Sequence, residues 1–129
     1  MRCTARMAQP EFRTEIAVGG HALVADEPAS RGGGDAGPAP YDLLLASLAA
    51  CTSMTLRIYA ARKDWPLEGL EVELSLLGMG ETLRIRRTLA IGGLDAEQQA
   101  RLADIAERTP VTLTLKRGLP IDTRLAPQE

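Results

Sequence analysis

The stretch 41–63 constrains the fold more than any other part of this sequence, because it contains neither glycine nor proline. Its letters, YDLLLASLAACTSMTLRIYAARK, predict one long helix, which Pro40 can open because the first helical position needs no N–H. At ~1.5 Å per residue such a helix is roughly 34 Å long. Residues 43–51 are apolar on nearly every side of it, which predicts burial all round. A small domain has too little sheet to supply that cover, so a second copy of the chain is the simplest source of it.

Alternating and turn-forming segments predict the other elements, and their order is that of an α+β fold. The Gly- and Pro-rich segment 26–40, DEPASRGGGDAGPAP, shows no periodicity and predicts a long loop of functional interest. A helix should begin after Asp95 and end before Pro110. The segment 110–116 fits either a strand or a short helix capped by Thr109. Strands are expected at 11–18, 21–25, 70–76, 82–91 and 121–126, with a weaker one at 3–8.

The composition limits the kind of protein this chain can be. Its 129 residues suit a single domain, 1–129, and 45% hydrophobic with 25% charged residues is ordinary for a soluble protein. A net charge of −2 with scattered arginines predicts no nucleic-acid surface, and the apolar run 43–51 is too short for a membrane span. The first residues contain no apolar signal segment, which predicts a cytoplasmic protein with reduced thiols. Cys3, Cys51 and one histidine fit no metal-ligand spacing, so neither a metal nor another cofactor is expected.

The residues around Cys51 are similar to those of a known family. The pattern H…DEP…GGGDAGPAPYDLLLASLAACTSMTLRIYAARKDWPLEGLEV resembles the signature of the OsmC/Ohr superfamily, the osmotically inducible and organic-hydroperoxide-resistance proteins, in its OsmC-like branch. The resemblance is most specific over 37–66 and extends in element order over nearly the whole chain. It implies an α+β, intertwined homodimer in which two long central helices are flanked by antiparallel sheets.

The resemblance also implies a thiol-dependent peroxidase chemistry. Cys51 matches the family's peroxidatic cysteine, which attacks a hydroperoxide as thiolate and becomes a sulfenic acid. The family's second cysteine, which forms a disulfide with the first, is replaced by Thr109 in the segment RTPVTLTLKRG. Cys3 could in principle take its place, although it lies near the end of the chain.

Two further residues of the family's site have uncertain counterparts in this sequence. In the peroxidase branches a glutamate follows the helix-opening proline and holds a catalytic arginine, whereas Tyr41 occupies that position and Asp42 is the first acid after it. Arg13 is the nearest candidate for the arginine, and Arg6 is the next. We expect Tyr41, His21 and Thr109 to border a binding cleft.

Two functions from different classes fit these residues. The first is an enzyme that reduces organic hydroperoxides through Cys51 in oxidative-stress defence and is regenerated by an external thiol reductant. The second is a non-enzymatic binder of a small hydrophobic ligand, in which Cys51 is only a packed thiol and Thr109 marks the lost redox partner. A lowered thiol pKa would favour the first function, and a raised one the second.

Overall fold

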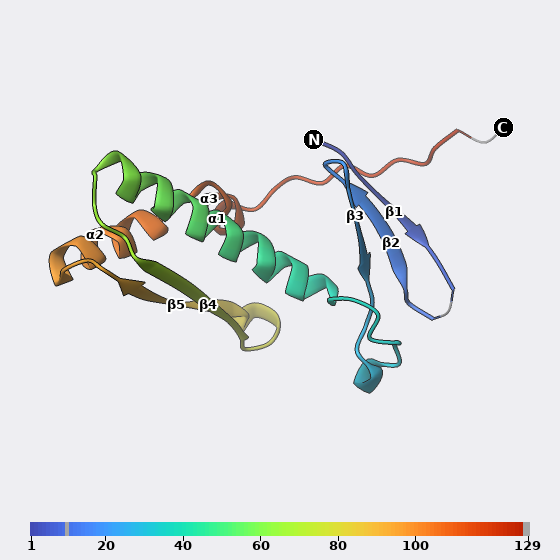
Figure 1. The fold of residues 1–129 in the computed structure, drawn as a ribbon. Coiled ribbons are helices and arrows are strands. Elements are labelled where there is room, and N and C mark those ends of the chain that lie inside the picture. Colours follow the sequence, from blue (N-terminus) through green and yellow to red (C-terminus); the bar gives the residue numbers. More distant parts are fainter. Residues whose placement is uncertain (10, 128–129) are drawn as a thin grey trace. The chain divides into compact units, whose positions relative to one another are not determined.

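The computed structural model describes residues 1–9 and 11–127 of the chain. The chain forms two compact units, Met1–Ser47 and Leu48–Glu129, and each unit contains an antiparallel sheet. One long helix, α1 (Pro40–Arg62), begins in the first unit and continues into the second (Figure 1). The combination of helices with two separate antiparallel sheets confirms the predicted α+β class.

The first unit is a sheet of three short strands that follow one another along the chain. They are β1 (Cys3–Met7), β2 (Thr14–Val18) and β3 (His21–Ala25), paired in that order. Residues 19–20, both glycine, turn β2 into β3 with positive φ angles that glycine adopts without strain. The register places Ala5, Ile16 and Leu23 side by side on one face. Met7 shares that face and is 85% exposed, whereas Ile16 and Leu23 are half-buried, so this face is only partly covered.

The loop after β3 is organised by the buried carboxylate of Asp26. Its Oδ1 accepts the N–H of Glu27 at 2.8 Å, and its Oδ2 accepts those of Gly34 at 3.2 Å and Ala36 at 3.1 Å. The Ala36 N–H is the main cause that lowers the pKa of Asp26, helped by the other two N–H groups and the charge of Arg13, while burial opposes it. One carboxylate therefore defines the path of a loop that has little regular structure.

Two glycines of this loop lie directly against backbone. A Cβ on Gly33 would collide with the carbonyl of Glu27, and a Cβ on Gly37 would collide with the carbonyl of Val24. Ahead of both glycines, the loop contains one short 3-10 helix, η1 (Ala29–Arg31). The Gly-rich composition that predicts a loop therefore reflects close approach of backbone segments as well as turning.

The second unit packs two helices and the C-terminal part of α1 against a β-hairpin. Its elements are β4 (Gly69–Leu77), the 3-10 helix η2 (Gly80–Thr82), β5 (Arg84–Gly92), α2 (Ala96–Ala106) and α3 (Pro110–Arg117). The centre of its core is a cluster from α1, α2 and the turn before α2, made of Leu56, Leu94, Leu102 and Ala106. Asp95 caps α2 as predicted, because its Oδ1 accepts the Gln98 N–H at 2.8 Å and Gln98 Oε1 accepts the Asp95 N–H at 3.0 Å.

The structure resolves one ambiguity of the sequence and corrects two expectations. Residues of the segment 110–116 form helix α3 rather than a strand. The strand expected at 121–126 is wrong, since those residues adopt neither helix nor strand, and a lone extended segment gains no ladder hydrogen bonds. The strand expected from residue 11 begins only at Thr14, because Glu11 has a positive φ of 57° and belongs to the preceding turn.

Helix α1 is buried along one side only within the chain. Its buried residues are Leu48, Thr52, Leu56 and Ala60, which recur every four positions. Within the run 43–51 only Leu48 is buried, so a single chain does not supply the all-round burial expected there. Further along the helix, Met54 is 64% exposed and Ile58 is 52% exposed. By length and composition α1 is long and apolar enough to span a membrane, although the run 43–51 by itself is too short. Core helices of soluble proteins can be equally long and apolar, so this property is weak evidence for a membrane span.

Candidate functional site

Cys51 lies on α1 as a free, half-buried thiol. Its Sγ is 3.9 Å from the hydroxyl oxygen of Thr55, one turn further along the helix. The buried residue beside it is Thr52, and Met54 and Ile58 follow Cys51 by three and seven positions, on its side of the helix. The thiol therefore lies at the border between the buried side of α1 and an exposed apolar stripe, which we define as Met54 and Ile58.

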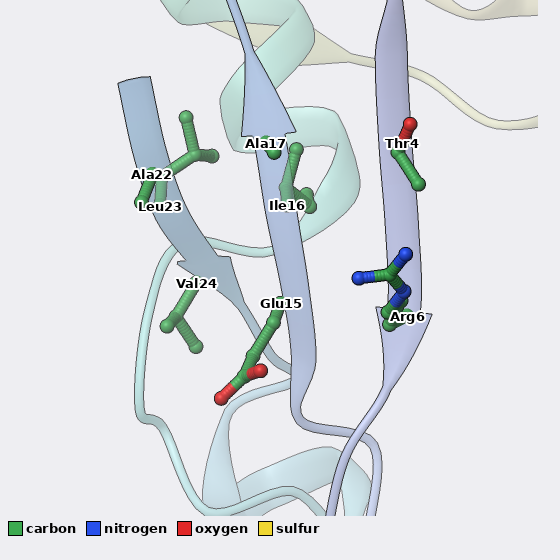
Figure 2. A pocket seen from close by; sticks show the side chains of 8 residues that line it. All are labelled: Thr4, Arg6, Glu15, Ile16, Ala17, Ala22, Leu23 and Val24. Atoms are coloured by element: carbon green, nitrogen blue, oxygen red, sulfur yellow. The ribbon is translucent and has the colours of Figure 1, made fainter. Parts of the chain in front are cut away.

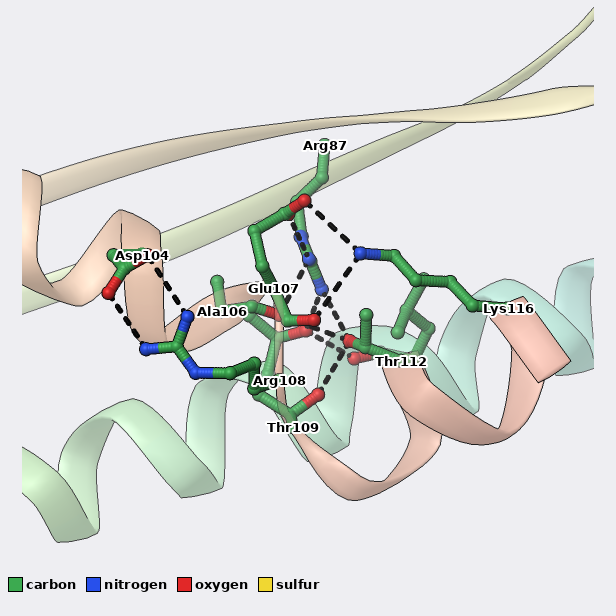
Figure 3. Close-up of polar contacts among 10 residues, drawn as sticks. Arg87, Asp104, Ala106, Glu107, Arg108, Thr109, Thr112 and Lys116 are labelled. Carbon is green, nitrogen blue, oxygen red and sulfur yellow. Dashed lines mark hydrogen bonds and ion pairs between the residues drawn. The ribbon is translucent and has the colours of Figure 1, made fainter.

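A largely buried arginine lies against the buried side of this helix turn. Arg87 points from β5 toward α1, α2 and α3, and only 12% of its side chain is exposed (Figure 3). Its Nη1 donates to the hydroxyls of Thr52 at 2.9 Å and Thr112 at 3.0 Å. Its Nη2 donates to the carbonyl of Ala106 at 2.7 Å and to the Glu107 carboxylate at 3.1 Å. One guanidinium thus connects three helices, which its rigid fork of donors allows.

The carboxylate of Glu107 lies between two cations at the end of this network. Lys116 Nζ contacts Glu107 Oε1 at 3.3 Å, and Arg87 Nη2 contacts Oε2 at 3.1 Å. Lys116 is the larger of the two causes that lower the pKa of Glu107, and Arg87 is the other. Because the Glu107 side chain is mostly exposed, this ion pair contributes less than the buried contacts of Arg87.

Thr109 is completely buried and belongs to the same network. Its hydroxyl is 2.6 Å from that of Thr112, which in turn donates to the Ala106 carbonyl at 3.2 Å. Thr109 is the N-cap residue of α3, which was one of the two alternatives that the sequence left open, but its hydroxyl bonds a side chain instead of a backbone N–H. A residue that is buried in this way does not line an open cleft in the single chain.

The other residues suggested by the sequence belong to the first unit. Asp42 Oδ2 accepts the backbone N–H of Ala39 at 3.0 Å, so this carboxylate stabilises the start of α1. Arg13 is half-buried and near Asp26, while Tyr41 and His21 are exposed. The structure thus assigns Asp42 a structural contact, and catalytic or binding roles for these residues remain predictions.

Sequence reasoning missed Arg87, although a signal for it was present. Strand β5 alternates between an inner, apolar face and an outer face, and the inner residues Ile85, Leu89 and Ile91 are paired with leucine or valine partners on β4 across the hairpin. Arg87 occupies an inner position, opposite Leu74. A charged residue on the apolar face of an alternating strand indicates a buried polar partner, because an unpaired buried charge is too costly.

A separate hollow lies on the sheet of the first unit (Figure 2). Its volume is about 580 Å³, and its lining is largely apolar except for Arg6, Glu15 and Thr4. The remaining lining residues are Ile16, Ala17, Ala22, Leu23 and Val24. No thiol lines this hollow. Among residues 1–9 and 11–127 there is also no group of three side chains that could hold a metal ion.

Comparison with known proteins identifies the family. The model of the family of OsmC-like proteins matches residues 32–124, which include α1 with Cys51 and the whole Arg87 network. This chain belongs to the OsmC-like family. None of the curated proteins compared with this OsmC-like protein matches it.

Solved structures share the fold of this OsmC-like protein at low sequence identity. An OsmC-like protein from Mycoplasma pneumoniae is 22% identical with a TM-score of 0.72, over 89% of this chain and 86% of that one. A protein from Legionella pneumophila is 24% identical with a TM-score of 0.66, over 89% and 88% of the two chains. The latter is described as an organic hydroperoxide resistance protein OsmC, "predicted redox protein, regulator of sulfide bond formation".

Proposed function

We propose that this OsmC-like protein is a one-cysteine, thiol-dependent reductase of organic hydroperoxides that acts in the cytoplasm in oxidative-stress defence. The observation that carries the proposal is the free, half-buried Cys51 inside the segment that matches the family. A reactive thiol must be reachable by its substrate, and the half-buried Cys51 at the border of the apolar stripe keeps part of its surface accessible. The description of the Legionella pneumophila protein supports the same chemistry.

The proposed reaction has two stages. In the first, the Cys51 thiolate attacks one oxygen of the hydroperoxide, an S–O bond forms as the O–O bond breaks, and the alkoxide leaves and takes up a proton to become an alcohol. The sulfur loses two electrons and becomes a sulfenic acid. In the second, an external thiol forms a mixed disulfide with Cys51 and releases water. A second external thiol then frees Cys51 and leaves as the disulfide of the reductant.

The residues that surround Cys51 would act on the thiol or on the substrate. The Thr55 hydroxyl is placed to donate to the sulfur, at 3.9 Å. Arg13 and Asp42 are the proposed polar residues of the site, and Tyr41 and His21 the proposed cleft residues, by the family resemblance. Since no thiol stands at position 109, the reductant must reach Cys51 itself.

We also propose that the active form is a homodimer of this single OsmC-like domain. A second copy would cover the apolar stripe, and burial of each such side chain is worth ~1.5–3 kcal/mol. The exposed sheet face with Met7 and the C-terminal segment with Ile121, which is 87% exposed, would find cover in the same way. Because Cys51 borders the stripe, its surroundings would be complete only in the dimer.

The proposal is tested by hydroperoxide consumption with a dithiol reductant. We expect the wild type to consume cumene hydroperoxide faster than hydrogen peroxide, and Cys51→Ser to reduce the rate to that of the buffer with reductant. Cys3→Ser is the matched control, because it removes the other free thiol and should keep the wild-type rate. Equal rates for the wild type and Cys51→Ser would refute the proposal.

The hollow on the first sheet favours a second candidate, a non-enzymatic binder of a small hydrophobic ligand. Its lining by Ile16, Leu23 and Val24 is suited to an apolar molecule, and its 580 Å³ is within the usual size of ligand sites. If Cys51 proves inert toward every hydroperoxide, retention of a fluorescent fatty-acid analogue by the wild type would support this function instead.

A further inference from the structure

Arg87 is the one charged residue on the otherwise apolar inner face of the described β4–β5 hairpin. An apolar side chain would fill this position at less cost, because a buried cation must be removed from water. The cost is met by four hydrogen bonds, from Nη1 to two threonine hydroxyls and from Nη2 to a carbonyl and a carboxylate. The position therefore requires an explanation beyond core packing.

The contacts of Arg87 fix one turn of α1 to the junction between α2 and α3. In the described chain Thr52 is the hydrogen-bond partner of Arg87 on α1. Its hydroxyl is used twice, because it accepts from Arg87 at 2.9 Å and donates to the Leu48 carbonyl at 2.7 Å. On the opposite side the guanidinium bonds Ala106 at the end of α2 and Thr112 in α3. The hydroxyl of Thr52 thus has a single orientation, set by a donor on one side and an acceptor on the other.

Cys51 precedes Thr52 in this fixed turn. We infer that Arg87 is a positioning residue that acts through the Thr52 hydroxyl to hold the turn of α1 that presents the Cys51 thiol. This inference rests on the proposed role of Cys51 as a reactive thiol. It does not require Arg87 to touch the hydroperoxide, so Arg87 is not a catalytic residue.

The test compares two variants of Thr52 that differ in one hydroxyl. Thr52→Val removes the acceptor but keeps the volume of the side chain and the charge of Arg87, whereas Thr52→Ser keeps the hydroxyl. Arg86→Met is the matched control, because Arg86 is the neighbouring arginine on the exposed outer face of β5. All variants are made in the full chain with Cys3→Ser, so that Cys51 is the only thiol.

The measurement is the rate of Cys51 alkylation by iodoacetamide as a function of pH, well below the unfolding temperature. We expect Thr52→Val to raise the rate roughly fivefold at every pH, the change that loss of one buried hydrogen bond can produce. Thr52→Ser should restore the wild-type rate, and Arg86→Met should leave it unchanged. A change in the accessibility of the Cys51 thiol multiplies the alkylation rate by the same factor at every pH. A change in the protonation of the thiol would instead shift the curve of rate against pH along the pH axis.

The inference is overturned if Thr52→Val lowers the unfolding midpoint but alkylates at the wild-type rate, because Arg87 would then only stabilise the fold. If Thr52→Val does not fold, Arg87→Lys replaces it, since one ammonium group cannot reproduce the fork of donors, and faster alkylation is again expected. Alkylation requires no hydroperoxide. A wild type that consumes no hydroperoxide therefore refutes the proposed function, while the alkylation rates still decide the role of Arg87.

Discussion

The hydroxyl oxygens of Thr109 and Thr112 lie 2.6 Å apart, and both side chains are buried. The Thr112 hydroxyl also accepts a hydrogen bond from Arg87 and donates one to the carbonyl of Ala106. At the position where the family resemblance implies a redox-active cysteine, this chain therefore has a hydroxyl committed to a polar network. The network stabilises the start of α3 and supplies no thiol to Cys51.

Replacement of Thr109 by valine should destabilise the protein by about 1 kcal/mol, the usual net contribution of one hydrogen bond. The loss should stay small because Thr112 keeps its contacts with Arg87 and Ala106. Urea unfolding measures the difference, and Thr88→Val on the exposed outer face of β5 is the matched control. Equal stability of the two variants would show that the Thr109–Thr112 contact contributes nothing.

Oxidation of Cys51 should add oxygen and form no internal disulfide. Thr109 has no thiol to trap a sulfenic acid, and Cys3 is an exposed residue of the first unit. After one equivalent of hydroperoxide, intact mass should rise by one oxygen atom per chain, and excess oxidant should add a second. Relative to its own unoxidised mass, Cys3→Ser should show the same increases. Loss of two hydrogens in the wild type but not in Cys3→Ser would instead reveal a disulfide between Cys3 and Cys51.

Protonation of Asp26 should loosen the loop that it organises. Its pKa is lowered in the folded chain, chiefly by the N–H of Ala36. The ionised form therefore favours folding: its contribution is complete above the unfolded pKa, about 4, and is lost as pH falls through the lower folded value. The free energy of unfolding should decrease in this acidic range, and less steeply in Asp26→Asn.

The control for this measurement is Asp122→Asn, which alters an exposed carboxylate in the C-terminal segment. It should retain the wild-type dependence on pH. Urea unfolding at several pH values provides the data. An unchanged slope in Asp26→Asn would mean that the carboxylate is not the group whose protonation destabilises the fold.

A lysine at the apolar stripe should prevent dimer formation while it leaves the chain folded. Met54 and Ile58 are mostly exposed in the single chain, so Met54→Lys or Ile58→Lys removes few contacts within it. In a dimer each lysine would bury a charge against apolar surface, at a cost of several kcal/mol. Sedimentation should show a wild-type dimer and smaller species for both variants, whereas Arg57→Gln, on an exposed polar position of α1, should remain dimeric. A folded wild-type monomer of 13.8 kDa would contradict the proposed dimer.

The sequence alone determined the long helix, most strands, the cap of α2 and the candidate thiol. These features depend on neighbouring residues: Pro40 at the helix start, the alternation along β4 and β5, and the reciprocal contact of Asp95 and Gln98. The position of Cys51 within a family motif is local in the same sense, which is why it could be identified before the structure was known.

Only the tertiary structure decided which polar groups meet. Arg87 and Thr52 are 35 positions apart, and no local pattern indicates that one donates to the other. The same holds for the segment 121–126, whose alternation suits a strand but which has no strand partner in the described chain. Local propensity sets the conformation of a segment, whereas a buried charge and a strand edge depend on partners that folding brings from distant parts of the chain.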